Sequence, residues 1–333
     1  MSEPRAPIGT TGRRRRLPPI RPRDLLAPAL AAIALASTVW GQAWPTAPPI
    51  AADLRAALDQ ADAGKPDDLV KLADGGRADA QFYAGVMFLS KGAAPTDGAK
   101  GCSYEERASA SRADAMYMVG RCYQHGLGGQ QDAGKAKAAF ARAAEMGLPK
   151  AKCALGEMLM AEPQEARRGL GLCEESARAG EVDAQVKVGD VYFSGGATKP
   201  DHAEARKWYD MAAKQQNPAA ARKLGTMYAK GDGGRRDPKR AMELWLAAEK
   251  GGDPLVSILV ADQLFSDLTG GRTPGPGKYA FKGGIPVKDI EVIEDWYREA
   301  QKRDPRPDVQ ERAKLGLSIL GSFKSAAEAV PKR

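Results

Sequence analysis

Histidine is almost absent from this chain, whose 333 residues include only His125 and His202. No Cys-x-x-Cys pair occurs, so a zinc site built from histidine and cysteine is disfavoured. The same scarcity leaves little room for a Ser-His-Asp or Cys-His catalytic set. No Gly-Lys-Ser/Thr sequence follows a glycine-rich stretch, which argues against a P-loop nucleotide site. We therefore expect no catalytic residue, no metal and no cofactor.

Beyond its N-terminus the chain has little excess of either charge. Residues 1–43 hold seven arginines against two acidic residues, which accounts for +5 of the net charge of +8. A nucleic-acid-binding domain needs a basic patch on its folded surface. Here the arginines form a basic tail over residues 1–24, so we expect no nucleic-acid partner.

Long apolar runs are also missing, except for the uncharged LLAPALAAIALASTVW at residues 25–40. A basic stretch before an apolar run predicts a secretory signal or a retained anchor. Sixteen residues are few for a membrane span, although extension to residue 44 gives 20. Residues 34–36, Ala-Leu-Ala, offer a cleavage site, whereas Trp40 and Trp44 suit a membrane interface. A buried helix of a soluble protein is a third alternative.

We predict that residues 25–44 are an inner-membrane signal anchor and that the rest of this single-pass chain lies in the periplasm. The alternative is a soluble periplasmic protein after signal cleavage. Because no cysteine precedes Cys102, lipoprotein attachment is excluded. Residues 45–65 then predict a proline-rich linker and a leading helix at 51–63.

A repeat of about 36 residues organises the chain after residue 65. Each unit opens with a small residue, has another small residue five positions later, and has a large residue eight positions later. The opening residues are Ala80, Ala115, Ala151, Ala184, Ala220 and Val256, followed by Gly85, Gly120, Gly156, Gly189, Gly225 and Ala261, and then by Phe88, Tyr123, Leu159, Tyr192, Tyr228 and Leu264. At about 100° per residue these offsets share one side of a helix. Each unit therefore predicts a first helix with one buried stripe.

A second helix follows in each unit. Eleven positions before the next opening residue stand Tyr104, Phe140, Cys173, Tyr209 and Trp245. The turns between the helices are rich in glycine and aspartate. Asp201 with Glu204 fits a capping box, and Asp237 before Pro238 fits an N-cap followed by proline at the first helical position. We predict an all-α fold of helix pairs.

These units resemble the Sel-one-like repeat family, a relative of the tetratricopeptide repeat. The best match is DAQVKVGDVYFSGG followed by WYDMAA within residues 183–213. The resemblance covers residues 66–265 and weakens toward residue 325. The third unit lacks the glycine-rich turn, and residues 267–288 interrupt the sixth. The family implies a right-handed superhelical solenoid that binds protein partners. Some members have been described as β-lactamase-like, but no Ser-x-x-Lys motif supports that activity here.

The four cysteines are Cys102, Cys122, Cys153 and Cys173, and both consecutive pairs are 20 residues apart. Each pair flanks a predicted turn, and residues equidistant from such a turn face each other. Because disulfides persist in exported proteins, we predict two bridges. Disulfides between helices of the cysteine-rich branch of the family support this by resemblance only. Four free thiols in apolar columns are the alternative.

The stacking implied by the resemblance directs one side of each first helix into a concave groove. That side would present Phe82, Tyr83, Tyr117, Met118, Arg121, Lys187, Asp190, Arg222 and Lys223. The mixture is aromatic and basic at one end and charged at the other. It suits a protein segment or an acidic polysaccharide. Alternatively, these residues are ordinary surface, and some pack on the next repeat.

The interruption at residues 267–288 is rich in glycine and proline. Its basic and aromatic residues are Arg272, Lys278, Tyr279, Phe281 and Lys282. Long loops in compact repeats are usually functional or disordered. We consider both a partner-binding hook and a solvated spacer. A last helix at residues 307–323 would cap the repeats.

Taken together, these patterns predict a non-catalytic scaffold or regulator in a bacterial cell-envelope complex. By resemblance, relatives act in exopolysaccharide synthesis and export and in envelope signalling. Exopolysaccharide synthesis or export is our first prediction. A periplasmic regulator of a membrane sensor kinase and a secreted binder of a host protein are the alternatives. A β-lactamase-like enzyme is disfavoured.

Overall fold

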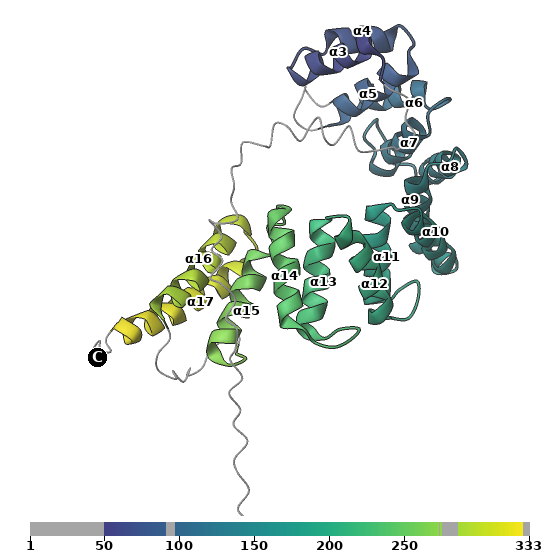
Figure 1. Cartoon of the computed structure of the whole chain (residues 1–333). Coiled ribbons are helices and arrows are strands. Elements are labelled where there is room, and N and C mark those ends of the chain that lie inside the picture. The colour runs from purple at the N-terminus through teal and green to yellow at the C-terminus, as the bar shows by residue number, and fades with distance from the viewer. Residues whose placement is uncertain (1–49, 91–96, 273, 275–285, 329–333) are drawn as a thin grey trace, which may run out of the picture. The chain divides into compact units, whose positions relative to one another are not determined.

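The computed structural model describes residues 50–90, 97–272, 274 and 286–328. All regular elements in these ranges are α-helices (Figure 1). The basic tail, the predicted membrane segment 25–44 and the loop residues Lys278, Tyr279, Phe281 and Lys282 lie outside the described residues. In the part of the chain that is described, no helix has the length and apolar character of a membrane span.

Two compact units contain these helices, one covering Leu30–Gly251 and the other containing Gly252–Arg333. The first unit begins with α3 (Ala52–Asp62) and α4 (Asp67–Asp74), and first and second helices then alternate. The first helices are α5 (Ala78–Leu89), α7 (Ala113–His125), α9 (Pro149–Met160), α11 (Val182–Ser194) and α13 (Pro218–Lys230). The second helices are α6 (Gly98–Ala108), α8 (Ala133–Glu145), α10 (Ala166–Arg178), α12 (His202–Lys214) and α14 (Pro238–Lys250). Within this compact unit each helix packs on its neighbours in the sequence, which confirms the predicted all-α solenoid of helix pairs.

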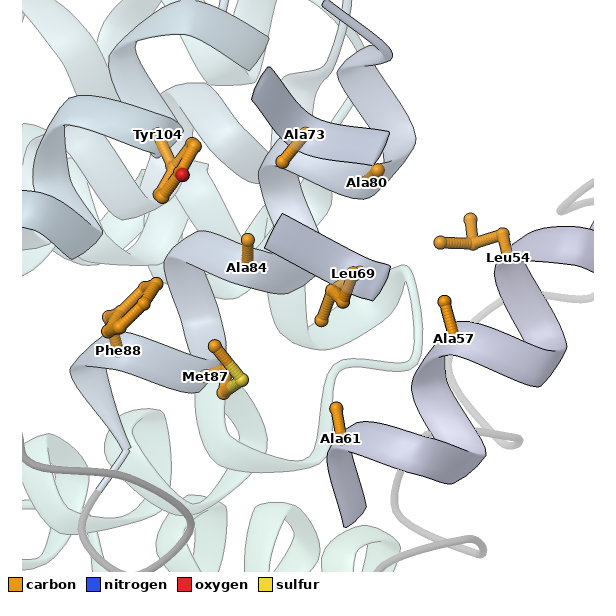
Figure 2. Close-up of a cluster of buried hydrophobic side chains, with 10 residues drawn as sticks. All are labelled: Leu54, Ala57, Ala61, Leu69, Ala73, Ala80, Ala84, Met87, Phe88 and Tyr104. Atoms are coloured by element: carbon orange, nitrogen blue, oxygen red, sulfur yellow. The ribbon is translucent and has the colours of Figure 1, made fainter. Parts of the chain in front are cut away.

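The N-terminal helices close one end of this core. Figure 2 shows Leu54, Ala57 and Ala61 along one side of α3, close to Leu69 of α4. Phe88 of α5 lies in the same cluster, and its ring stacks on Tyr104 at 5.9 Å between centroids. Helix α3 therefore removes from water an apolar surface that the first repeat would otherwise expose.

Aspartate caps explain where most second helices begin. The side chains of Asp97, Asp132, Asp201 and Asp237 each accept a hydrogen bond, at 2.9–3.0 Å, from the backbone N–H three residues later. Both predicted N-caps are thus confirmed. Only half of the predicted capping box forms, because the Asp201 N–H donates to the Tyr192 carbonyl and the Glu204 carboxylate contacts Lys207.

Tyrosines of the buried stripe connect successive units. The hydroxyl of Tyr123 in α7 donates to Glu106 in α6 at 3.1 Å, and that of Tyr192 in α11 donates to Glu174 in α10 at 2.7 Å. The hydrogen bond from Tyr192 to Glu174 is the main cause that raises the pKa of Tyr192 to about 12. Each contact joins the first helix of one unit to the second helix of the unit before it.

In three helix pairs, the glycine in the middle of the first helix gives an aromatic ring room to approach. A Cβ atom built on Gly120, Gly189 or Gly225 would lie 2.5–2.7 Å from the ring of Phe140, Tyr209 or Trp245, respectively. These distances are far below van der Waals contact. The glycines therefore set the spacing between the two helices of these pairs.

Replacing Gly189 or Gly225 with leucine should unfold the adjacent repeats, because each ring would lose its place in the core. We expect a loss of about 2 kcal/mol of unfolding free energy, measured by thermal circular dichroism. Gly134→Ala is a control, because a Cβ there meets only the Asp132 carboxylate at 3.4 Å. Unchanged melting of both leucine variants would contradict this explanation of the glycines.

The third pair, α9 and α10, is built differently. Its glycine, Gly156, faces Gly169 rather than a ring, and a Cβ on either residue would lie 2.4 Å from the other's carbonyl oxygen. The two backbones are therefore in direct contact. This close approach accompanies the absence of the glycine-rich turn, since only Ala161–Glu165 separate the helices.

Both predicted disulfides form. Cys102–Cys122 joins α6 to α7 and so connects two consecutive units, whereas Cys153–Cys173 joins the two helices of the third unit. All four cysteines of the chain are used. The arrangement with four free thiols is not the one observed.

Removing Cys102–Cys122 with a double serine substitution should lower the unfolding free energy by about 2 kcal/mol, because the unfolded chain gains freedom. Denatured, unreduced wild-type protein should show no reactive thiol, and reduction should release four. The double serine variant of Cys153 and Cys173 provides the matched comparison. Four reactive thiols before reduction would rule out both bridges.

The second compact unit contains α15 (Ser257–Thr269), α16 (Val287–Arg303) and α17 (Pro307–Glu328). Helix α17 extends beyond the predicted end at residue 323. Its Gly316 faces the buried Tyr297 of α16, with a built Cβ 2.6 Å from the ring. The Tyr297 hydroxyl donates to Asp262 of α15 at 3.0 Å, and Arg312 of α17 pairs with the same carboxylate at 3.1 Å. The glycine–ring contact of the repeats thus recurs here between α16 and α17.

Candidate partner-binding surface

The predicted groove residues lie on four first helices. Phe82 and Tyr83 belong to α5, Tyr117, Met118 and Arg121 to α7, Lys187 and Asp190 to α11, and Arg222 and Lys223 to α13. All nine side chains are partly buried. We call these residues, together with their partners Arg112, Lys150 and Glu157, the first-helix face. Arg272, the one predicted hook residue within the described ranges, is exposed in the other unit.

Cations over aromatic rings connect the N-terminal helices of this face. The Arg112 guanidinium lies 4.6 Å from the centre of the Phe82 ring, and the Lys150 ammonium lies 4.8 Å from that of Tyr117. Arg112 precedes α7, and Lys150 belongs to α9, so each contact links one first helix to the next. Such contacts are worth roughly 0.5–1 kcal/mol at exposed sites.

Ion pairs make the same connections farther along the chain. Lys187 of α11 pairs with Glu157 of α9 at 3.2 Å, and Lys223 of α13 pairs with Asp190 of α11. The hydroxyl of Tyr209 also donates to Asp190. This hydrogen bond adds to burial, the larger cause, in raising the pKa of Tyr209. The charged end of the first-helix face is therefore largely neutralised by its own side chains.

The remaining predicted residues have varied surroundings. Tyr83 packs against the core cluster that includes Leu54, and burial raises its pKa. The backbone carbonyl of Arg222 accepts a hydrogen bond from the Trp245 indole at 3.2 Å. Arg121 differs, because its Nε atom is buried without a hydrogen-bond partner in the described structure.

Sequence reasoning missed Arg112, Lys150 and Glu157. Glu157 carries a signal that could have found it, since it stands six positions after its opening residue, as Asp190 does. Arg112 and Lys150 precede or begin their helices, outside the offsets that define the face. Only the relative placement of neighbouring first helices shows that they contact it.

Beside this face lies a buried carboxyl group that the pattern did not predict. Glu105 of α6 is fully buried, and neither of its carboxyl oxygens has a hydrogen-bond partner in the part of the chain described. It packs against Gly85 of α5. Burial raises the pKa of Glu105 to about 9, and Asp114 raises it further, whereas Arg112 and Lys150 lower it. The group is therefore protonated at neutral pH.

The two histidines lie at helix ends. His125 is exposed at the C-terminal end of α7, and His202 begins α12, where its ring stacks on Phe193 at 4.8 Å. Among the described residues, no group of three or more histidine, cysteine, aspartate and glutamate side chains could hold a metal ion.

Comparisons with known proteins agree with this architecture. A family model described as Sel1 repeat matches residues 113–148, 182–217 and 218–253. The crystal structure of a protective antigen from uropathogenic Escherichia coli, which displays an SLR fold, superposes with a TM-score of 0.57 at 23% identity. That match covers 80% of this chain and 53% of the antigen, so the chain spans about half the antigen's length.

A Sel1 repeat protein from Oxalobacter formigenes superposes with a TM-score of 0.53 at 20% identity, covering 77% of this chain and 100% of that one. A search of curated protein sequences finds no match. The matched segments correspond to α7–α8, α11–α12 and α13–α14, which are helix pairs of the kind predicted. The chain therefore contains three Sel1 repeats within an all-α solenoid fold.

Proposed function

We propose that this protein is a non-catalytic scaffold that binds a protein partner in the bacterial cell envelope. The observation that carries the proposal is the first-helix face, where aromatic and charged side chains from successive repeats form one connected surface. Repeat solenoids use extended surfaces of this kind for binding. Interaction is also the general role of Sel1 repeats.

Two features support a location outside the cytoplasm. The structure contains two disulfides, which persist mainly in oxidising compartments. The basic tail and apolar run of the N-terminal sequence suit an exported chain. Within that proposal we retain the inner-membrane anchor as the first arrangement and the cleaved periplasmic protein as its alternative.

The proposal also names the process that the scaffold serves. Exopolysaccharide synthesis or export is our first candidate, and regulation of a membrane sensor kinase is the second. Both would place the partner in or beside the inner membrane. The protein would position that partner rather than transform a substrate.

A crosslinking pull-down from membranes, with the mature N-terminus sequenced in the same preparation, tests the proposal. An intact N-terminus with a co-purifying membrane synthase or sensor kinase would support the anchored scaffold and identify its process. A chain that begins near Ser37 or Trp44, in the soluble fraction and without a membrane partner, would count against the anchored form. Failure to capture any protein would count against the scaffold itself.

A further inference from the structure

Two cations on the first-helix face have no ion pair among the described residues. They are Arg121 of α7 and Lys150 of α9. Arg112, Lys187 and Lys223 differ, since Arg112 donates to the Asp114 carboxylate at 3.0 Å and the lysines of α11 and α13 pair with acids. The Arg121 Nε atom also lacks a hydrogen-bond acceptor in the described structure, although it is buried. A buried donor without an acceptor costs about 1–3 kcal/mol.

The register of the repeats explains why the positive charge remains here. In two places, the residue six positions after one opening residue pairs with the residue three positions after the next. These pairs are Glu157 with Lys187 and Asp190 with Lys223. In the second repeat the corresponding position holds Arg121, and the matching position of the third repeat holds Ala154. Alanine cannot neutralise a guanidinium, so the series of ion pairs is interrupted between α7 and α9.

The position of Tyr117 relates the two cations to each other. Lys150 lies over its ring, and Arg121 follows it by four residues, so Arg121 and Tyr117 share one side of α7. Glu105 and Glu181 are carboxyl groups near Lys150, but neither forms an ion pair with it. Glu105 is protonated at neutral pH and therefore carries no compensating charge.

We propose that Arg121 and Lys150, beside Tyr117, bind a carboxylate of an acidic segment in the partner protein. This inference rests on the scaffold function proposed above and names the chemistry of the partner. A carboxylate would give the Arg121 guanidinium, which has no ion pair in the described structure, a partner in the charge-assisted geometry that guanidinium groups favour. The ring of Tyr117 already contacts Lys150 and lies 5.4 Å from Phe140, so it is not an open platform for a sugar. The contacts therefore favour an acidic peptide over an acidic polysaccharide.

Fluorescence anisotropy with a labelled hexaglutamate peptide and the full-length chain tests the site. We expect saturable binding at low salt that weakens as salt is raised. The substitutions R121Q and K150Q should each weaken binding about tenfold. Lys135→Gln is the matched control for Lys150, because Lys135 lies 5.2 Å from the Tyr123 ring on another pair of helices. Arg142→Gln, which removes an exposed arginine paired with Glu145, is the control for Arg121.

The results separate this inference from the scaffold function. Equal peptide binding by wild type and the R121Q/K150Q variant would overturn the proposed carboxylate site. Binding of an oligouronate but not of hexaglutamate would overturn the choice of a peptide. If the membrane partner is crosslinked equally by wild type and by R121Q/K150Q, the scaffold function stands and the carboxylate site is wrong. If neither protein crosslinks a partner, the scaffold function fails as well.

Discussion

Leucine in place of Gly156 should destabilise the protein more than any other glycine substitution proposed for it. The reason is that Gly156 of α9 faces the backbone of Gly169 in α10, where even a Cβ atom would lie 2.4 Å from a carbonyl oxygen. A side-chain ring can rotate or shift to admit a new group, but two helix backbones can separate only as a whole. The Cys153–Cys173 disulfide joins the same helices and resists that separation. We expect a loss of at least about 3 kcal/mol of unfolding free energy.

Thermal and urea unfolding, followed by circular dichroism, would measure this loss. Gly171→Ala is the matched control on the same helix pair, because a Cβ at Gly171 of α10 meets nothing within 4 Å. That control should be neutral or slightly stabilising, since alanine favours helix by up to about 1 kcal/mol over glycine. If Gly156→Leu unfolds at the same temperature and urea concentration as Gly171→Ala, the contact between the two backbones is not what holds α9 and α10 together.

Gly156 also shows how far the sequence pattern reaches. The spacing of small residues predicts one buried stripe in each first helix, and in the first five repeats the glycine of that stripe lies where another helix approaches it. What the glycine meets is harder to predict, because the third unit is three residues shorter than its neighbours. Its second helix carries Cys173 at the position where three other pairs place a ring, and the backbone of Gly169 lies closest to Gly156 instead. A repeat pattern predicts equivalent positions only while the units keep their length.

In the first repeat, two ways of counting to the ring position differ by a single residue. Counting back eleven positions from Ala115 places Tyr104 in the ring position, whereas counting forward twenty positions from Gly85 places Glu105 there. Where successive opening residues are 36 apart, both counts reach the same residue, but here the interval is 35. In the structure Glu105 packs against Gly85, and Tyr104 donates instead to Asp74 at 2.8 Å.

Contacts between first helices were the least predictable part of the candidate site. The sequence places Lys187, Asp190 and Lys223 on the correct helices and on one side of each. Which of them touch depends on how successive first helices are rotated and shifted relative to one another. That arrangement follows from the packing of whole helix pairs, including the glycine contacts, rather than from the pattern of one helix. The pairing of Glu157 with Lys187 became visible only in the assembled stack.

Glutamine in place of Glu105 should stabilise the protein at neutral pH and remove part of its pH dependence. The folded-state pKa of about 9 lies well above the ordinary value of 4.5. Between these values the unfolded chain releases the Glu105 proton and the folded chain keeps it. Stability therefore falls as pH rises, by up to about 1.4 kcal/mol per pH unit, and the loss is complete above the folded pKa. At pH 7 the unfolding free energy is therefore lower than at acidic pH, where Glu105 is protonated in both states, by on the order of 3 kcal/mol.

Urea unfolding of wild type and Glu105→Gln between pH 5 and pH 9 measures this effect. The two stabilities should converge near pH 5 and diverge as pH rises, because glutamine keeps the shape of the protonated acid without its ability to ionise. Glu105→Phe should also be more stable than wild type at neutral pH, since the next pair places Phe140 against the equivalent Gly120. Glu145→Gln is the control, because Glu145 is exposed and should follow the wild-type curve. Parallel curves for wild type and Glu105→Gln would mean that Glu105 is solvated or paired in solution, and that the first helix pair differs from the one described.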